Sequence, residues 1–176
     1  MADKVRRAMA KSSYPFTSNE AANALLAKDG TALLIGLCLD QQIRTEKAMG
    51  GPYELRKRLG TIDAAKIART PLPRLDRVFR ESPALHRFPG SMAKRVKALC
   101  EVIASEYGGR GSRVWSAAKS SDEVYERLLA LPGFGKDKAS AGVYMLARFG
   151  GVKLPGWRSY RCDAALPWVI KDGKRS

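Results

Sequence analysis

The segment from Leu131 to Ala139 has the residue types and spacing of a phosphate-binding turn. It reads Leu-Pro-Gly-Phe-Gly-Lys-Asp-Lys-Ala and lies between two stretches with helical apolar spacing. Gly133 and Gly135 allow a tight turn and let a partner approach the backbone closely. The amides at the start of the following helix, expected from Lys136 to Phe149, are N–H donors at the positive end of a helix dipole. A nucleic-acid phosphate fits both this geometry and this charge.

The alternative is an ordinary turn in which glycine ends the first helix. Leu131 and Phe134 argue against it, because apolar residues at these positions can anchor the turn to the core. Lys136 and Lys138 at the start of the second helix also argue against it, because they add attraction to phosphate that does not depend on base sequence.

The overall charge favours the same kind of partner. The chain has 32 Lys and Arg against 17 Asp and Glu, a formal net charge of +15, and a pI near 10.1. The excess of basic residues recurs along the whole chain and not in one detachable tail, so nucleic acid is the expected partner. A solvated surface without a partner is the alternative.

The apolar pattern predicts an all-α fold. Apolar residues recur at spacings of three and four, and no alternating strand-like stretch occurs. We treat residues 1–176 as one domain, with a helix-hairpin-helix at about 121–149 and a basic C-terminal tail at about 150–176. Capping boxes at Thr17–Glu20 and at Ser120–Glu123 each open one expected helix. Between them we expect an apolar helix from Thr31 to about Gln42 and a helix at Glu46–Leu59 that is interrupted near Gly50–Pro52. Further helices are expected at Asp63–Arg69, Arg74–Arg80 and Ser91–Tyr107.

Three cysteines, Cys38, Cys100 and Cys162, lie far apart and show neither disulfide nor metal-ligand spacing. Cys38 and Cys100 lie among apolar residues and are expected to be buried thiols. The sequence shows no signal peptide and no membrane-spanning segment. We therefore expect a monomer in a reducing, cytoplasmic location, associated with the nucleoid if the source is prokaryotic.

The motif L-P-G-F-G-x-x-K-A at 131–139 resembles the hairpin of the helix-hairpin-helix-GPD superfamily, the endonuclease III-like DNA glycosylases. Residues 33–42 resemble that superfamily's buried helix ending in L-S-x-Q. Residues 88–96 resemble its segment in which a small residue and a serine start a long helix. The resemblance spans about residues 21–150 and is greatest to a branch without the four-cysteine iron–sulfur loop.

The resemblance implies two helical lobes around a cleft, with bent double-stranded DNA against it and the target base flipped into it. Gln42 matches the position that enters the gap left in the helix, although it equally fits a polar residue that ends a buried helix. Arg87 and Ser91 are implied DNA contacts. The backbone carbonyls of Leu129, Leu131 and Phe134 are the implied ligands of a monovalent cation, Na or K, and no iron–sulfur cluster or other cofactor is expected.

The resemblance also suggests catalytic residues. Asp163 lies in the region of the superfamily's catalytic aspartate, although it also fits a helix cap. Asp137, a second candidate, occupies the position where bifunctional members have a nucleophilic lysine. A one-residue step turns a helical side chain by about 100°, so neither Lys136 nor Lys138 simply replaces that lysine. The chain ends shortly after Asp163, so we expect a shortened C-terminal part of the bundle.

The resulting expectation is a base-excision repair protein, a monofunctional DNA glycosylase that hydrolyses the N-glycosidic bond of a damaged or mismatched base. One alternative is a non-catalytic module that uses the hairpin to recognise bent, nicked or gapped DNA. A second alternative is an RNA-associated protein, because phosphate binding does not distinguish the two sugars.

Overall fold

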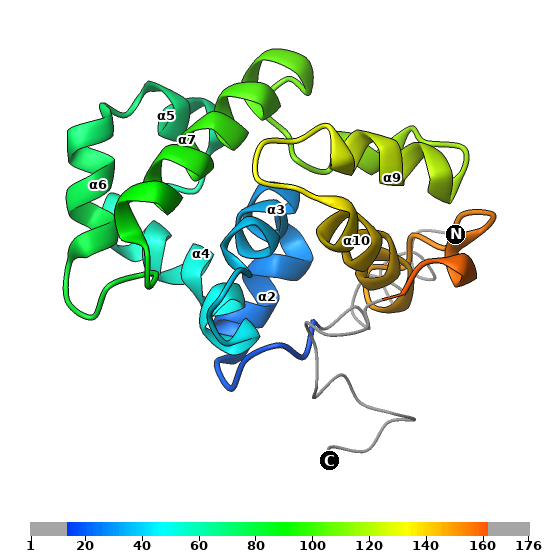
Figure 1. Cartoon of the computed structure of the whole chain (residues 1–176), viewed down its shortest axis with the longest axis horizontal. Helices are drawn as coiled ribbons and strands as arrows, with labels where there is room; N and C mark the ends of the chain where they lie inside the picture. Colours follow the sequence, from blue (N-terminus) through cyan, green and yellow to red (C-terminus); the bar gives the residue numbers. More distant parts are fainter. Residues whose placement is uncertain (1–13, 162–176) are drawn as a thin grey trace, which may run out of the picture.

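The computed structural model describes residues 14–161, and this part of the chain is all-helical, without strands (Figure 1). The predicted all-α class is therefore confirmed. Its helices are α2 (Glu20–Lys28), α3 (Gly30–Leu39), α4 (Thr45–Leu59), α5 (Ala64–Arg69), α6 (Leu72–Arg80), α7 (Pro89–Glu106), α8 (Arg113–Ser116), α9 (Ser121–Leu129), α10 (Lys136–Arg148) and the 3₁₀ turn η1 (Trp157–Ser159).

Helix α3 is the centre of the fold. Every residue from Thr31 to Leu39 is buried, which agrees with its apolar composition on all sides. It packs against α2, α4, α7 and α10, and α5 and α6 pack in turn against α7. Figure 1 shows α3 between the group α5–α7 and the pair α9 and α10. The two groups therefore share α3 as a common core.

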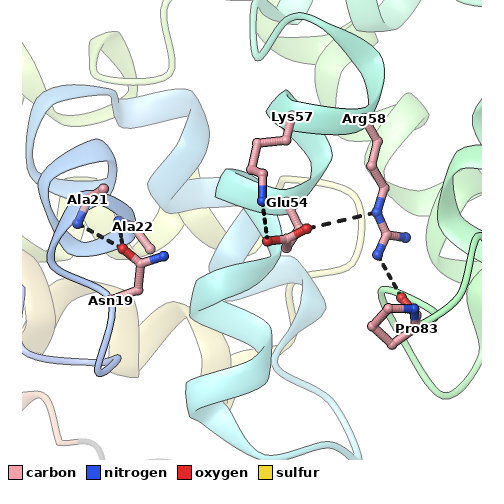
Figure 2. Close-up of polar contacts among 7 residues, drawn as sticks. All are labelled: Asn19, Ala21, Ala22, Glu54, Lys57, Arg58 and Pro83. Carbon is pink, nitrogen blue, oxygen red and sulfur yellow. Dashed lines mark hydrogen bonds and ion pairs between the residues drawn. The ribbon is translucent and has the colours of Figure 1, made fainter.

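Helix α2 begins differently from the expected capping box. The side chain of Asn19, and not that of Thr17, caps it, accepting hydrogen bonds from the N–H groups of Ala21 at 2.9 Å and Ala22 at 3.2 Å (Figure 2). The Thr17 hydroxyl instead accepts the N–H of Asn19 at 3.0 Å. One short amide side chain thus satisfies two free N–H groups, which is a typical N-cap.

Helix α4 is continuous, and the interruption expected near Gly50–Pro52 is absent. Close packing against α3 explains the continuity. A Cβ at Gly51 would lie 2.6 Å from Cδ1 of Leu39, and a Cβ at Gly36 would lie 2.9 Å from Sδ of Met49. The glycines therefore bring the two helices closer together than larger residues could, and this contact holds α4 together through Pro52.

The Arg58 guanidinium joins α4 to the segment after α6. It donates to the carbonyls of Val78 at 3.2 Å and Glu81 at 2.8 Å. Figure 2 shows its further contacts, with the carbonyl of Pro83 at 2.7 Å and with the carboxylate of Glu54 at 3.9 Å. The Val78 carbonyl belongs to the last turn of α6 and has no donor within the helix, and the carbonyls of Glu81 and Pro83 follow the helix. Arg58 therefore has a structural role.

The hairpin region closes the fold. Ser120 caps α9 as predicted, because its side chain accepts the N–H of Glu123 at 3.1 Å. Glu123 reaches back one residue further than in a capping box and accepts the N–H of Lys119 at 2.8 Å. The segment after α10, which begins the expected basic C-terminal tail, folds back onto the hairpin helices. The N–H of Ser121 donates to the carbonyl of Pro155 at 3.0 Å, and the Ser140 hydroxyl donates to the carbonyl of Arg161 at 2.9 Å.

Within residues 14–161, no single helix is long and apolar enough to span a membrane; α2 and α3 together reach that length and apolarity, but they are bent by 115°. Cys38 and Cys100 are fully buried free thiols, as predicted, and Cys162 lies outside the described residues.

A glycine pair tests the packing around α3. A Cβ at Gly30 would lie 2.3 Å from the backbone nitrogen of Ser112, so Gly30→Ala should lower the free energy of unfolding by roughly 1–3 kcal/mol. A Cβ at Gly50 would have Cγ2 of Thr17 as its nearest neighbour, 4.0 Å away, so Gly50→Ala should raise the free energy of unfolding by about 0.5–1 kcal/mol. Chemical denaturation measures both changes, and equal stability of the two variants would contradict the packing.

Candidate nucleic-acid interface

The hairpin between α9 and α10 is anchored to the core by its apolar residues. Leu131 and Phe134 are both buried, and the Phe134 N–H donates to the Leu131 carbonyl at 3.1 Å. Gly133 has a φ of +82°, a left-handed conformation that side chains rarely adopt. A Cβ there would also lie 3.0 Å from Sγ of Cys38. Gly133 is therefore required by the turn and by its contact with α3.

Neither its backbone conformation nor its packing requires a glycine at position 135. Its φ of −98° and ψ of −175° are ordinary extended backbone, and no atom lies within 4 Å of a Cβ built there. It is the N-cap of α10, and no side chain caps that helix. Gly135, Lys136 and Asp137 are all exposed. The start of α10 therefore presents an open, uncapped helix end to a partner.

Lys138 lies inside the hairpin. Its ammonium donates to the carbonyl of Cys38 at 2.8 Å and to the carbonyl of Gly133 at 3.1 Å. Burial lowers the pKa of Lys138, and the nearby Arg95 lowers it further. Lys138 thus joins the end of α3 to the hairpin, and a contact of this side chain with DNA stays a prediction.

The loop after α3 projects Gln42. This residue has a φ of +55° and an exposed side chain, and a left-handed backbone is uncommon for residues other than glycine. Its neighbour Gln41 is fixed, because its side-chain oxygen accepts a hydrogen bond from Arg95. The surrounding contacts thus hold Gln42 in a conformation that it would rarely adopt alone.

His86 fixes the same loop from the other side. Its Nδ1 accepts the N–H of Phe88 at 2.9 Å, so the proton of the neutral ring is on Nε2. Nε2 lies 3.1 Å from the carbonyl of Leu39 and 3.0 Å from that of Gln41, and it donates to them. The residue is 1% exposed, and burial lowers its pKa. His86 therefore has a packing role in the core.

A second exposed group lies at the start of α7. Arg87, Phe88 and Ser91 are exposed, and the Arg87 guanidinium lies 5.3 Å from the centre of the Phe88 ring. They line a groove of about 620 Å³ that also includes Arg80 and Lys94. Phe88, 41% exposed, is the one exposed large hydrophobic residue within 14–161. In the sequence, Phe88 is the first residue of the segment 88–96, and nothing in that pattern predicts its exposure.

The structure brings together some of the predicted site residues and leaves others undecided. The hairpin and the loop carrying Gln42 are joined, because Arg95 contacts Gln41 and its Cδ would lie 3.8 Å from a Cβ at Gly133. Asp137 is exposed beside the hairpin. Asp163 lies outside the described residues. Asp40, a further carboxylate to consider if Asp163 proves dispensable, is the C-cap of α3 in this same region.

No protein-family model matches the chain, and no curated protein matches it. A solved structure that does match is that of a trapped endonuclease III–DNA covalent intermediate, an estranged-adenine complex, with a TM-score of 0.51 and 17% identity. The match covers 86% of this chain and 61% of that chain, so this chain spans about three-fifths of the other's length. The chain therefore has an endonuclease III-like fold, as the sequence predicted.

The buried neutral His86 should make stability depend on pH. The unfolded chain has an ordinary histidine pKa of about 6.5, whereas burial lowers the folded value. The stabilisation is therefore full above about pH 6.5 and is lost as the pH falls toward the folded pKa. We expect the stability advantage of the wild type over His86→Gln, measured by denaturation, to shrink from pH 7 to pH 5. An advantage that stays constant would contradict this assignment.

Proposed function

We propose that the protein binds double-stranded DNA through the hairpin face and is a monofunctional DNA glycosylase of base-excision repair. The observation that carries this proposal is the rigid connection between the hairpin and the loop of Gln42. Lys138 and Arg95 hold the two together from inside, and both Gly135 and Gln42 remain exposed. A phosphate contact and a contact inside the duplex can therefore be made from one rigid unit.

Each part of this unit suits one task. The uncapped amides at the start of α10, with Lys136, would bind a phosphate without reading base sequence. Gln42 would enter the gap left by a flipped base, and Phe88 offers an apolar surface for stacking. Arg87 and Ser91 would contact the DNA backbone beside Phe88.

The residue types favour hydrolysis over covalent catalysis. Asp137 replaces the lysine needed to form a Schiff base with the sugar, so no protein–DNA imine is expected. A carboxylate near the sugar would stabilise the positive charge that develops as the base leaves, and Asp163 is assigned this role, with Asp137 as the second candidate. The carbonyls of Leu129, Leu131 and Phe134 would hold a monovalent cation. The Leu131 carbonyl accepts one hydrogen bond and keeps a second lone pair for this purpose.

Gly135→Val tests the phosphate contact. The open space around Gly135 means that a valine should leave the fold intact but separate the backbone from a phosphate. We expect the Kd for a duplex with an abasic-site analogue, measured by fluorescence anisotropy, to rise at least tenfold, or about 1.4 kcal/mol. Thermal unfolding serves as the control for folding. Full affinity in a folded variant would place the DNA contact elsewhere.

Base release tests the chemistry. The protein is incubated with duplexes that contain uracil, hypoxanthine, an alkylated adenine or an oxidised guanine, and strands are analysed with and without alkali. A monofunctional glycosylase should give cleavage only after alkali, and borohydride should trap no adduct. Asp163→Asn should abolish release at unchanged DNA affinity.

Three outcomes would change the proposal. Adduct formation would indicate a lysine nucleophile. Release that survives Asp163→Asn would remove that residue from catalysis. Tight binding of bent or gapped DNA without release from any duplex would favour a non-catalytic binding module.

A further inference from the structure

Asp40 is a partly buried carboxylate at the point where the two halves of the fold meet. It is the C-cap of α3, and the hydroxyl of Thr45, at the start of α4, lies 3.1 Å and 3.3 Å from its two carboxylate oxygens. The side chain remains partly accessible to solvent. Asp40 is thus held in one orientation without being sealed inside the core.

The groups around Asp40 come from several elements and are mostly basic. Lys138 of α10 interacts with it electrostatically. Arg95 of α7 binds the adjacent Gln41. His86 binds the carbonyls of Leu39 and Gln41, the residues on either side of Asp40, but burial keeps its ring neutral near pH 7.

These surroundings change the pKa of the Asp40 carboxyl group. Burial raises the pKa of Asp40 to about 6, although the hydrogen bond from Thr45 and the charge of Lys138 oppose the change. The group is therefore an ionised carboxylate at neutral pH and can still accept a proton. A side chain that acts as a general base is most effective when its pKa lies near the pH at which the protein works.

The position of Asp40 relative to Gln42 gives this carboxylate a function. The two residues are two positions apart, so their Cα atoms lie within about 7 Å of each other. If Gln42 fills the gap left by a flipped nucleotide, the sugar of that nucleotide passes close to Asp40. Lys138, which interacts electrostatically with Asp40, donates to the Cys38 carbonyl and so belongs to the same junction.

We propose that Asp40 is the catalytic base that activates water for hydrolysis of the N-glycosidic bond. This inference rests on the proposed glycosylase function. The bond between the base nitrogen and C1′ breaks and its electron pair leaves with the base. The water oxygen forms the new bond to C1′, and Asp40 takes the proton that the water loses. That proton then passes to the departed base, so the products are the free base and an abasic sugar.

The test is the pH dependence of single-turnover base release, measured on whichever duplex of the panel above the wild type cleaves. The wild-type rate should fall as the pH drops below about 6. Asp40→Asn should lower the rate at pH 7 by about 100-fold or more and remove this dependence, at unchanged DNA affinity. Glu106→Gln, an exposed carboxylate at the end of α7, is the matched control and should behave as the wild type.

Thr45→Val provides a second test that a purely structural role would not satisfy. It removes the hydrogen bond that lowers the pKa of Asp40, so the fall in rate should move to higher pH. An unmoved profile, or wild-type release by folded Asp40→Asn, would overturn the assignment of Asp40 while leaving the glycosylase function intact. Absence of release by the wild type from every duplex would overturn both.

Discussion

The carbonyl groups at the C-terminal end of α3 place the strongest constraint on this structure. The last four carbonyls of a helix lack donors within the helix, and here they lie at the end of a helix that is buried on every side. Water cannot hydrogen-bond to all of these carbonyls, so other parts of the protein must donate hydrogen bonds to them. Lys138 donates to Cys38, His86 donates to Leu39, and the N–H of Asp40 donates to Leu37 at 3.2 Å. The hairpin, the loop before α7 and the turn of Gln42 thus converge on α3 because its end requires them.

Because buried carbonyls need donors, the basic side chains fall into two groups. Some basic side chains bind backbone carbonyls and hold elements together: Arg58 beyond α6, Lys97 at the carbonyls of Ala68 and Thr70, and Arg127 at the carbonyl of Val114. Others, such as Lys136 and Arg87, are exposed. The formal charge of +15 therefore overstates the charge that is free to meet a polyanion, and the arrangement of the exposed residues matters more than the total.

Local sequence signals predicted the helices and the hairpin because those features depend on neighbouring residues. Periodicity and the Ser120–Glu123 box gave α9 correctly, and the two glycines marked the turn. Contacts between distant segments were beyond such signals. The sequence treats Lys136 and Lys138 alike, and only the approach of α3 decides that Lys138 lies inside. The bond from His86 to Leu39 crosses 47 residues, and the left-handed backbone of Gln42 depends on the contacts around it.

The position of α3 between the two groups of helices also determines how the molecule unfolds. A helix that is apolar all round and contacts both groups of helices cannot be assigned to either one as its private core. Separating the groups would expose a continuous apolar surface along α3, which favours aggregation. The two groups should therefore lose their structure together, in one cooperative transition, even though they look like separate lobes. A break in the chain between them would yield two fragments that need each other to become soluble and folded.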